Sequence, residues 1–473
     1  HKAAFEECKS LQLTNLPDNV TEIGDGAFYN TNIESIDIPA SVTKLGERSF
    51  ETKTIKEFKV SNNSPWNEDT KKYVCGRYSN KVRLVTINAQ ADKELEPPCL
   101  SKVTDVNEMK NSAGKNFVFE NAENLFYDST NKFIFECIEN SKLVLVAYYG
   151  DQEFVNVPQK FSIDNQKYDV TSIGKYAFCR RKNLKFVNFP QSITEIGEGA
   201  FHYCTNLQST RLPYGVNKIG IAAFQYCEDL KLTNLPSGVT EIGESAFDGC
   251  TKLQLRKLPN NITKIGAFSF RHCKNIKLTE LPKDITKIPA FAFQYCKNLK
   301  LTKLPNNVTE IGKSAFEGCT NLGLAELPDG VTEIGKSAFE GCANLGLVEL
   351  PDGVTEIGES AFNGCTNLQL KKLPDNITEI GAFSFAHCEN IDLTELPKDI
   401  TKIPAFAFQN CTNLKLTKLP DGVTEIRRGA FQDCTQLKLT NLPGEVTEIG
   451  ENAFTCCENL QLKELPANVT KIG

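Results

Sequence analysis

Cysteine is the reactive residue that recurs most regularly in this chain of 473 residues. Twelve cysteines follow one another at intervals of 23 residues, and a phenylalanine stands three residues before each. The members of this ladder are Cys204, Cys227, Cys250, Cys273, Cys296, Cys319, Cys342, Cys365, Cys388, Cys411, Cys434 and Cys457. Such a file of thiols could form disulfides, hold metal, supply a nucleophile or serve only as packing, and each use demands a different geometry.

The period itself disfavours a disulfide ladder. If each 23-residue unit forms one coil, equivalent Cα atoms of neighbouring coils lie about 4.8 Å apart, which a disulfide tolerates. Parallel side chains in register keep the Cβ atoms near that same separation, whereas a disulfide prefers about 3.8 Å. The sequence therefore predicts free thiols that fill space beside a core.

Metal binding and catalysis find little support in the same residues. A zinc site needs close pairs of ligands, but only Cys456 and Cys457 are close, and adjacent residues usually point in different directions. Histidines stand singly beside ladder cysteines, at His202, His272 and His387. No base accompanies one activated thiol, and no glycine-rich phosphate loop is present. We therefore predict that the chain is not an enzyme and has no catalytic residues, no metal site and no cofactor.

The sequence around the cysteines repeats with the same period and reads A-F-x-x-C-x-N-L-x-L-x-x-L-P-x-x-V/I-T-E/K-I-G. Such a period is typical of a repeat solenoid, because one unit cannot bury its apolar face without its neighbours. Alternating apolar residues in Asn298–Pro305 predict one short strand, and V-T-E-I-G predicts a second. A turn pair rich in Gly, Asn and Asp joins them, and E-S-A-F predicts a single helical turn.

The regular array occupies residues 170–473, and residues 1–50 contain amino-terminal copies of the same unit. Residues 51–169 depart from the period. Within them, Lys72–Ile87 and Lys132–Tyr148 each contain two alternating apolar runs around a polar centre, which predicts two β-hairpins inserted into enlarged coils. Repeat sequences flank this irregular segment on both sides, so we expect one continuous solenoid.

A longer duplication is also present in the array. Residues Ala267–Gly312 and Ala382–Arg427 differ at only eight of 46 positions. Charge is inverted at two of these positions, Lys274 and Lys277, while the predicted core residues are unchanged. The duplication therefore separates a constant interior from a variable exterior.

The unit resembles the leucine-rich repeat of BspA-like proteins, also called the Treponema pallidum type, as Ala246–Phe268 (AFDGCTKLQLRKLPNNITKIGAF) illustrates. The stretch Asn32–Gly46 (NIESIDIPASVTKLG) matches the L-x-x-I-x-I-P spacing of that family. The resemblance implies a right-handed α/β, mostly β, superhelix of 23-residue coils with a concave parallel sheet. It also implies a secreted or cell-surface protein that adheres to host extracellular matrix or to other cells, and it implies no reaction.

Composition sets outer limits on the function. With a formal charge of -6 and 40% hydrophobic residues, the chain has no overall basic character that would attract nucleic acid. Its longest apolar run, Leu143–Tyr149, is far shorter than the roughly 18 residues of a membrane span. Both ends fall inside a repeat, so we expect a piece of a longer product.

Asparagine begins an N-x-S/T sequence at six places, which would accept glycans in a secreted eukaryotic protein. These residues are Asn19, Asn62, Asn261, Asn307, Asn376 and Asn468. All except Asn62 also follow from the repeat, in which a turn that favours asparagine precedes V-T or I-T. We favour the second explanation.

A binding role remains for the predicted exterior. Hot spots in protein interfaces favour Trp, Tyr and Arg, which are concentrated in the irregular segment and at a few positions of the array. The candidate ligand contacts are Trp66, Tyr73, Tyr78, Tyr127, Tyr148, Tyr149, Arg256 and Arg271. We therefore predict a non-catalytic adhesion or protein-interaction module. The alternative is a structural spacer or self-assembling coat scaffold without a specific ligand.

Overall fold

The chain folds into two compact units, His1–Met109 and Lys110–Gly473, in a computed structural model. Residues 166–473 are described without interruption. The earlier residues described are 4–5, 7–9, 11, 13, 16, 20, 22–38, 42, 44–61, 75, 83–87, 93–95, 125–128, 132–138 and 142–163. Each unit has its own apolar core, and the division between them differs from the predicted boundaries at residues 50 and 169.

Short strands organise the described part of the first unit. They are β1 (Glu22–Ile23), β2 (Ser35–Ile38), β3 (Lys44–Leu45), β4 (Glu57–Ser61), β5 (Arg83–Ile87) and β6 (Lys93–Leu95). Strands β2, β4 and β5 pair in parallel, β5 and β6 pair antiparallel, and β1 pairs with β3. Ile36 of β2 lies opposite Phe58 of β4, and both side chains are fully buried. The parallel pairing of β2 and β4 therefore places apolar side chains in the core of the first unit.

Longer strands begin the second unit. They are β7 (Leu125–Asp128), β8 (Phe133–Ile138), β9 (Lys142–Tyr148), β10 (Phe154–Asn156), β11 (Lys160–Ile163), β12 (Gln166–Ile173) and β13 (Phe186–Asn188). Strands β8 and β9 pair antiparallel, which confirms the hairpin predicted in Lys132–Tyr148. Of the hairpin predicted in Lys72–Ile87, only Cys75 and strand β5 are described, and β5 pairs with β4 and β6.

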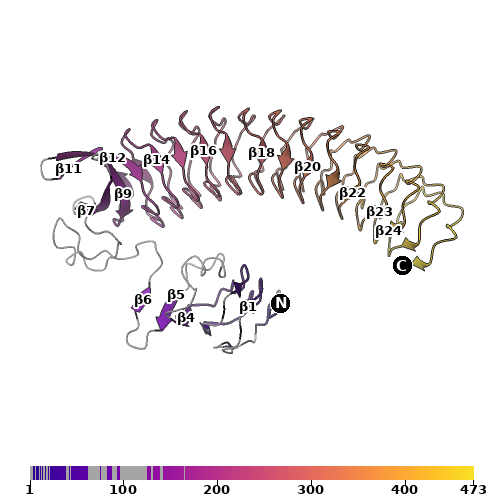
Figure 1. Cartoon of the computed structure of the whole chain (residues 1–473), viewed down its shortest axis with the longest axis horizontal. Helices are drawn as coiled ribbons and strands as arrows, with labels where there is room; N and C mark the ends of the chain where they lie inside the picture. Colours follow the sequence, from indigo (N-terminus) through magenta and orange to yellow (C-terminus); the bar gives the residue numbers. More distant parts are fainter. Residues whose placement is uncertain are drawn as a thin grey trace. The chain divides into compact units, whose positions relative to one another are not determined.

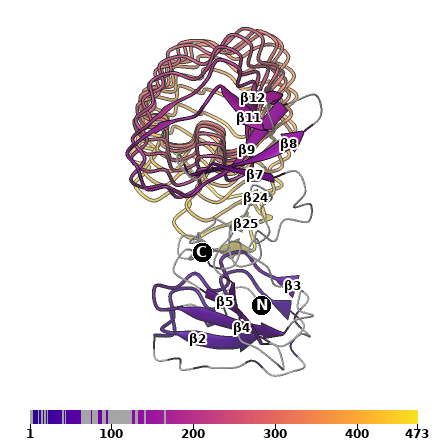
Figure 2. The ribbon, with the colours of Figure 1, turned by 90° about the vertical axis from the view of Figure 1, so that its left-hand side faces the viewer.

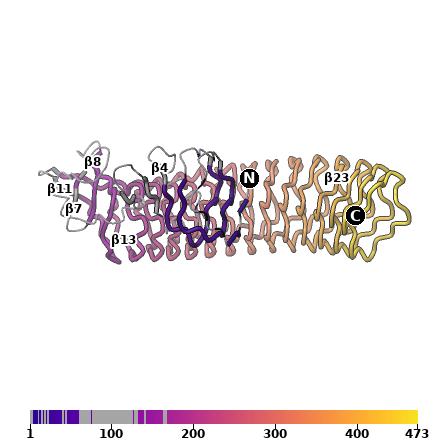
Figure 3. The backbone as a smooth tube through the Cα atoms, turned by 90° about the horizontal axis from the view of Figure 1, so that it is seen from below, coloured from indigo at the N-terminus to yellow at the C-terminus, as the bar shows by residue number. Residues whose placement is uncertain are grey.

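From residue 195 onward, each coil contributes one strand of two residues, Glu-Ile or Lys-Ile. These strands are β14 (Glu195–Ile196), β15 (Lys218–Ile219), β16 (Glu241–Ile242), β17 (Lys264–Ile265), β18 (Lys287–Ile288), β19 (Glu310–Ile311), β20 (Glu333–Ile334), β21 (Glu356–Ile357), β22 (Glu379–Ile380), β23 (Lys402–Ile403), β24 (Glu425–Ile426), β25 (Glu448–Ile449) and β26 (Lys471–Ile472). Successive coils of the array have the same backbone course and stack side by side (Figures 1, 2 and 3). In the described part of the chain, no helix combines the length and apolar character needed to cross a membrane.

Proline divides the two-residue strands into separate sheets. Gly312 N–H donates to the carbonyl of Ile288 in the preceding coil at 2.8 Å, and the equivalent glycine of most coils does the same. Pro289 and Pro404 occupy this position in two coils and have no N–H to donate. The sheet is interrupted at these coils, between β17 and β18 and between β22 and β23.

A second set of bonds between coils lies on the turns that follow each strand. Ser245, Phe247 and Gly249 donate their N–H groups to carbonyls of the next coil, each at 2.8 Å. The residues between them donate to carbonyls three residues back in the same coil. The helical turn predicted for Glu244–Phe247 is therefore wrong: Ser245 has a φ of 53°, and every second N–H bonds outside the coil.

The strand predicted in Asn298–Pro305 is also absent. Leu299, Leu301 and Leu304 are buried as the alternation indicates. Within this fully described segment, however, Lys300 is the one backbone donor to the preceding coil, at 3.1 Å. With the L-x-L-x-x-L spacing of the array, the leucines stay buried but no strand forms. The I-x-x-I-x-I spacing of Ile33, Ile36 and Ile38 instead accompanies strand β2, which pairs with β4.

Files of identical side chains build the interior of the array. Phe293, Phe316, Phe339 and Phe362 are fully buried, and their ring centroids lie 5.5 to 5.6 Å apart in nearly parallel planes. Each ring therefore packs on the equivalent ring one coil away, and no coil can bury its own phenylalanine alone.

Candidate functional site

The cysteine ladder faces the core, as predicted. From Cys204 to Cys434, every ladder thiol is free and fully buried, and Cys457 is half-buried. Each donates its S–H to a phenylalanine carbonyl of the preceding coil, as Cys342 does to Phe316 at 3.1 Å. Burial raises the pKa of Cys204 to about 12. Such thiols stay protonated at neutral pH, so they serve as packing and as hydrogen-bond donors rather than as nucleophiles.

Some predicted contacts of the irregular segment have no described side chain. Trp66, Tyr73 and Tyr78 lie outside the described residues. The backbone of Tyr127 belongs to β7, where it pairs with Ile134 of β8. These four residues stay predictions.

The remaining tyrosines of the irregular segment are described in full. Tyr148 is 1% exposed and packs against Phe133 and Phe178, with centroid distances of 5.3 and 5.2 Å. It belongs to the core, so its prediction as a ligand contact is wrong. Tyr149 is half-buried, and its hydroxyl donates to the Asp128 carbonyl at 3.4 Å.

The two predicted arginines occupy different environments. Arg256 is exposed, which leaves it free to contact a partner. Arg271 is half-buried and donates from Nε and Nη2 to the two carboxylate oxygens of Asp248, at 3.0 and 2.7 Å. Its guanidinium also lies 4.8 Å from the ring centroid of Phe268. These contacts fix the guanidinium of Arg271 against the array, while part of the side chain remains exposed.

An aromatic patch beside Arg271 escaped the sequence analysis. It consists of Phe268, Phe291, His272 and Tyr295, all half-buried on the turns of two adjacent coils. The rings of Phe268 and Phe291 stack at 4.6 Å, and those of His272 and Tyr295 stack at 5.0 Å. All four residues have φ between 57° and 61°. Phe268 and Phe291 are spaced by 23 residues at a position where several other coils have serine, and this difference in the sequence could have indicated the patch.

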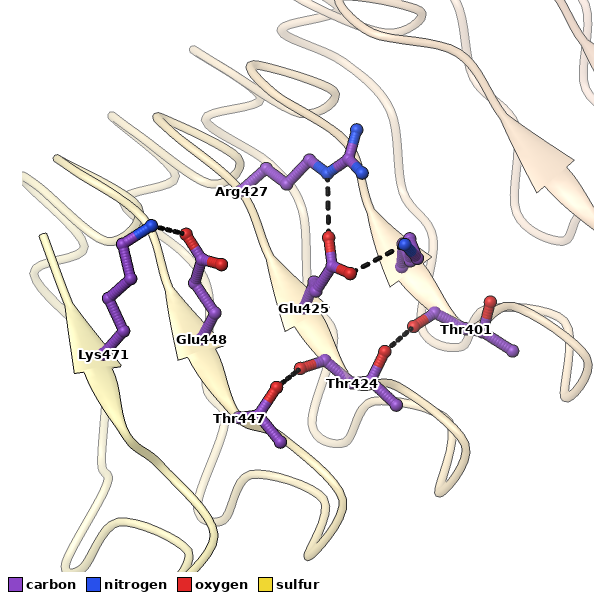
Figure 4. Close-up of polar contacts among 8 residues, drawn as sticks. Thr401, Thr424, Glu425, Arg427, Thr447, Glu448 and Lys471 are labelled. Atoms are coloured by element: carbon purple, nitrogen blue, oxygen red, sulfur yellow. Dashed lines mark hydrogen bonds and ion pairs between the residues drawn. The ribbon is translucent and has the colours of Figure 1, made fainter.

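The outward residues of the two-residue strands form a charged file. In the last coils, Arg427 contacts Glu425 at 3.1 Å and Lys471 contacts Glu448 at 2.6 Å (Figure 4). Beside them, the threonine that precedes each of these strands, Thr424, Thr447 and Thr470, donates its hydroxyl to the carbonyl of the threonine one coil earlier, at 3.2 to 3.3 Å. Exposed pairs of this kind contribute little to stability. This face is therefore a solvated surface on which hydrogen bonds and ion pairs hold neighbouring side chains in place.

Three adjacent strands of that file lack a cation. Glu333, Glu356 and Glu379 lie in register on β20, β21 and β22, and none has an ion pair among the described residues. The described part of the chain contains no group of three or more His, Cys, Asp or Glu side chains that could hold a metal ion. The three glutamates therefore form a patch of negative surface.

Shallow grooves recur where the leucine–proline corners of neighbouring coils meet. One groove of about 370 Å³ is lined by Leu396 and Pro397, with Lys398, Lys418 and Glu395 at its edges. Similar grooves of about 390 and 340 Å³ occur at other coils. Because these grooves repeat with the coils, they do not single out one small-molecule site.

The turn asparagines of the N-x-T sequences hold neighbouring coils together. The side-chain amides of Asn261, Asn307 and Asn376 each donate to a carbonyl of the preceding coil at 3.2 Å. Asn468 does the same at 2.8 Å. These amides therefore have a structural role in the repeat.

Comparison with known proteins gives a consistent result. The family model described as "BspA type Leucine rich repeat region (6 copies)" matches residues 1–94, 150–277, 218–346, 286–415 and 378–473. A leucine-rich repeat protein from Bacteroides ovatus ATCC 8483 is 28% identical over 76% of this chain and 91% of its own, with a TM-score of 0.59. No curated protein sequence matches the chain.

Other solved structures show lower similarity. A leucine-rich cell surface protein from Faecalibacterium prausnitzii A2-165 is 26% identical over 74% of this chain and 94% of its own, with a TM-score of 0.48. A leucine-rich repeat protein from T. pallidum is 24% identical over 56% of this chain and 90% of its own, with a TM-score of 0.24.

Proposed function

The chain belongs to the BspA-type leucine-rich repeat family, and on that basis we propose that it is a non-catalytic protein-interaction module. It acts at a cell surface, where it adheres to host extracellular matrix or to another cell. The family match covers residues 1–94 and 150–473. A partner that binds within the matched residues contacts the surface of the repeats.

The duplicated blocks carry this proposal. Ala267–Gly312 and Ala382–Arg427 keep every leucine, isoleucine, phenylalanine and cysteine in common. Of the eight positions that differ, seven are exposed or half-buried in the first block. A spacer would need only the constant core, whereas a recognition surface requires an exterior that changes from coil to coil.

The aromatic patch and its arginine supply suitable contact chemistry. Tyrosine and arginine are favoured at interface hot spots because each combines a large apolar body with a polar end. In the second block, Asn410 replaces Tyr295 and Ala386 replaces Arg271. The two copies therefore offer a partner different surfaces on the same backbone.

The chemistry of the interior supports a role without catalysis. The most regular reactive groups, the ladder thiols, are buried and hydrogen-bonded to carbonyls, and burial raises the pKa of Cys204 to about 12. Exposed carboxylates and lysines lie in solvated files rather than around one polarised centre.

The test is binding of the full chain to immobilised matrix proteins and to intact cells. Tyr295→Asn, which copies Asn410, should weaken protein binding about tenfold, the effect of losing one hot-spot contact. Tyr214→Asn, at a tyrosine that is 75% exposed, is the matched control and should have little effect. Absence of binding to all targets, together with self-association in light scattering, would instead favour the coat scaffold.

A further inference from the structure

We propose that Lys274, Lys277, Lys297 and Lys300, the lysine cluster, form a binding surface for a linear sulfated polysaccharide. This goes beyond the protein-interaction role proposed above, because it names a second class of partner and a different set of residues. The four lysines come from two adjacent coils and are all exposed.

Hydrogen bonds hold the two coils in register at this place. The N–H of Lys300 donates to the Leu278 carbonyl at 3.1 Å, and the Asn298 amide donates to the Asn275 side chain at 3.3 Å. Lys297 follows Cys296 as Lys274 follows Cys273, and Lys277 and Lys300 each stand between two buried apolar residues. Two pairs of equivalent lysines therefore project from neighbouring coils, with a backbone separation of roughly 5 Å.

The cluster lacks internal neutralisation. Two lysines of the preceding coil are paired, Lys252 with Asp229 at 2.7 Å and Lys257 with Glu280 at 2.9 Å. Within the described residues, by contrast, no carboxylate lies within ion-pair distance of any member of the cluster. Like charges held side by side on neighbouring coils repel one another. A bound polyanion would relieve this repulsion.

The second block shows that the fold does not require these charges. Glu389, Asp392 and Thr412 replace Lys274, Lys277 and Lys297, while Lys415 is retained. Lys415 then pairs with Asp392 at 2.8 Å. Across the whole block, eight basic and three acidic residues in Ala267–Gly312 become five and six in Ala382–Arg427. The same backbone therefore carries one strongly basic surface and one neutralised surface.

The shape and chemistry around the cluster fit an extended sugar chain with repeated anions. Lysine ammonium groups act as point charges that need no planar partner, which suits sulfate. His272 and Tyr295 stand two residues before Lys274 and Lys297, so single-stranded DNA, whose bases could stack on such rings, is a comparison ligand in the test. Gly323 and Gly346 occupy the position of Lys300 in the next two coils. A Cβ added to either would meet nothing within 4 Å, so the space beside these coils is also open.

The experiment measures binding of the full chain to heparin as a function of NaCl concentration. Lys274→Glu/Lys277→Asp, which copies Glu389 and Asp392, should weaken binding at least about tenfold, because repulsive charge replaces attraction. The slope of log K against log [NaCl] should fall by about 1 to 2. Lys398→Glu/Lys438→Asp makes the same change in charge at exposed lysines elsewhere and should retain most of the affinity.

Three outcomes would overturn the proposal. They are no binding of heparin by the wild-type chain, equal losses in the two double variants, or equal affinity for desulfated heparin or single-stranded DNA. Binding to matrix proteins, tested by Tyr295→Asn, is a separate measurement, so failure of the two proposals can be distinguished. Thermal unfolding followed by circular dichroism checks that each variant is folded.

Discussion

The guanidinium of Arg271 donates two hydrogen bonds to the carboxylate of Asp248 in the preceding coil, at 3.0 and 2.7 Å. The Asp248 side chain is fully buried, and that of Arg271 is 27% exposed. Five coils later, Asn363 and Ala386 occupy the same two positions. The buried carboxylate and its cation are therefore present together at positions 248 and 271 and absent together at positions 363 and 386.

Arg271→Ala should destabilise the chain by about 3 to 5 kcal/mol, because it leaves a buried carboxylate without its cation. The double variant Asp248→Asn/Arg271→Ala, which copies Asn363 and Ala386, should recover most of that loss. Urea unfolding followed by circular dichroism measures both. Equal midpoints for the single and double variants would show that the two residues do not act as a pair.

The phenylalanine file should dominate the stability of its coils. Phe316→Ala removes a fully buried ring stacked between Phe293 and Phe339 and should cost about 3 to 5 kcal/mol. Lys313→Ala, at an exposed position three residues earlier, should cost far less. Both are measured by chemical denaturation, and similar losses would mean that the assignment of inner and outer faces is wrong.

Alkaline pH should unfold the array. Burial raises the pKa of Cys204 to about 12, against an ordinary value of 9.0, and raises the pKa of the Cys342 thiol well above its usual range. Because the folded pKa exceeds the unfolded pKa, this stabilisation is complete below about pH 9 and is lost as the pH rises toward 12. Circular dichroism against pH should show cooperative loss of structure in that window. Constant stability up to pH 12 would contradict the burial of the ladder.

The period, the buried residues and the state of the thiols could be predicted from the sequence, because each depends on spacing alone. Leu299, Leu301 and Leu304 are buried as expected. The strand assigned to them was wrong because alternation reports which side chains face the core and not which N–H groups find partners. Pro289 and Pro404 were a signal that was not used: neither residue has an N–H to donate, and the sheet is interrupted at each.

The aromatic patch was harder to predict because its geometry depends on unusual backbone. Phe268 and Phe291 stack on turns of adjacent coils where both residues have φ near 57°. Hot-spot composition alone favoured Tyr148 instead, whose ring packs inside the core. Residue type indicates what a side chain can do, whereas its position in the coil decides whether a partner can reach it.

The most direct test of the account is thiol labelling of the native chain with an aqueous reagent, followed by mass spectrometry. If each coil returns its cysteine to the same inner wall, Cys8 and Cys456, which are exposed, should react with the reagent before any buried ladder thiol does. Cys204 to Cys434 of the ladder should stay unmodified until denaturant is added, and should then all react as free thiols. Rapid labelling of the ladder in the native chain, or ladder cysteines that remain oxidised after denaturation, would contradict the stacked solenoid and the exterior recognition built on it.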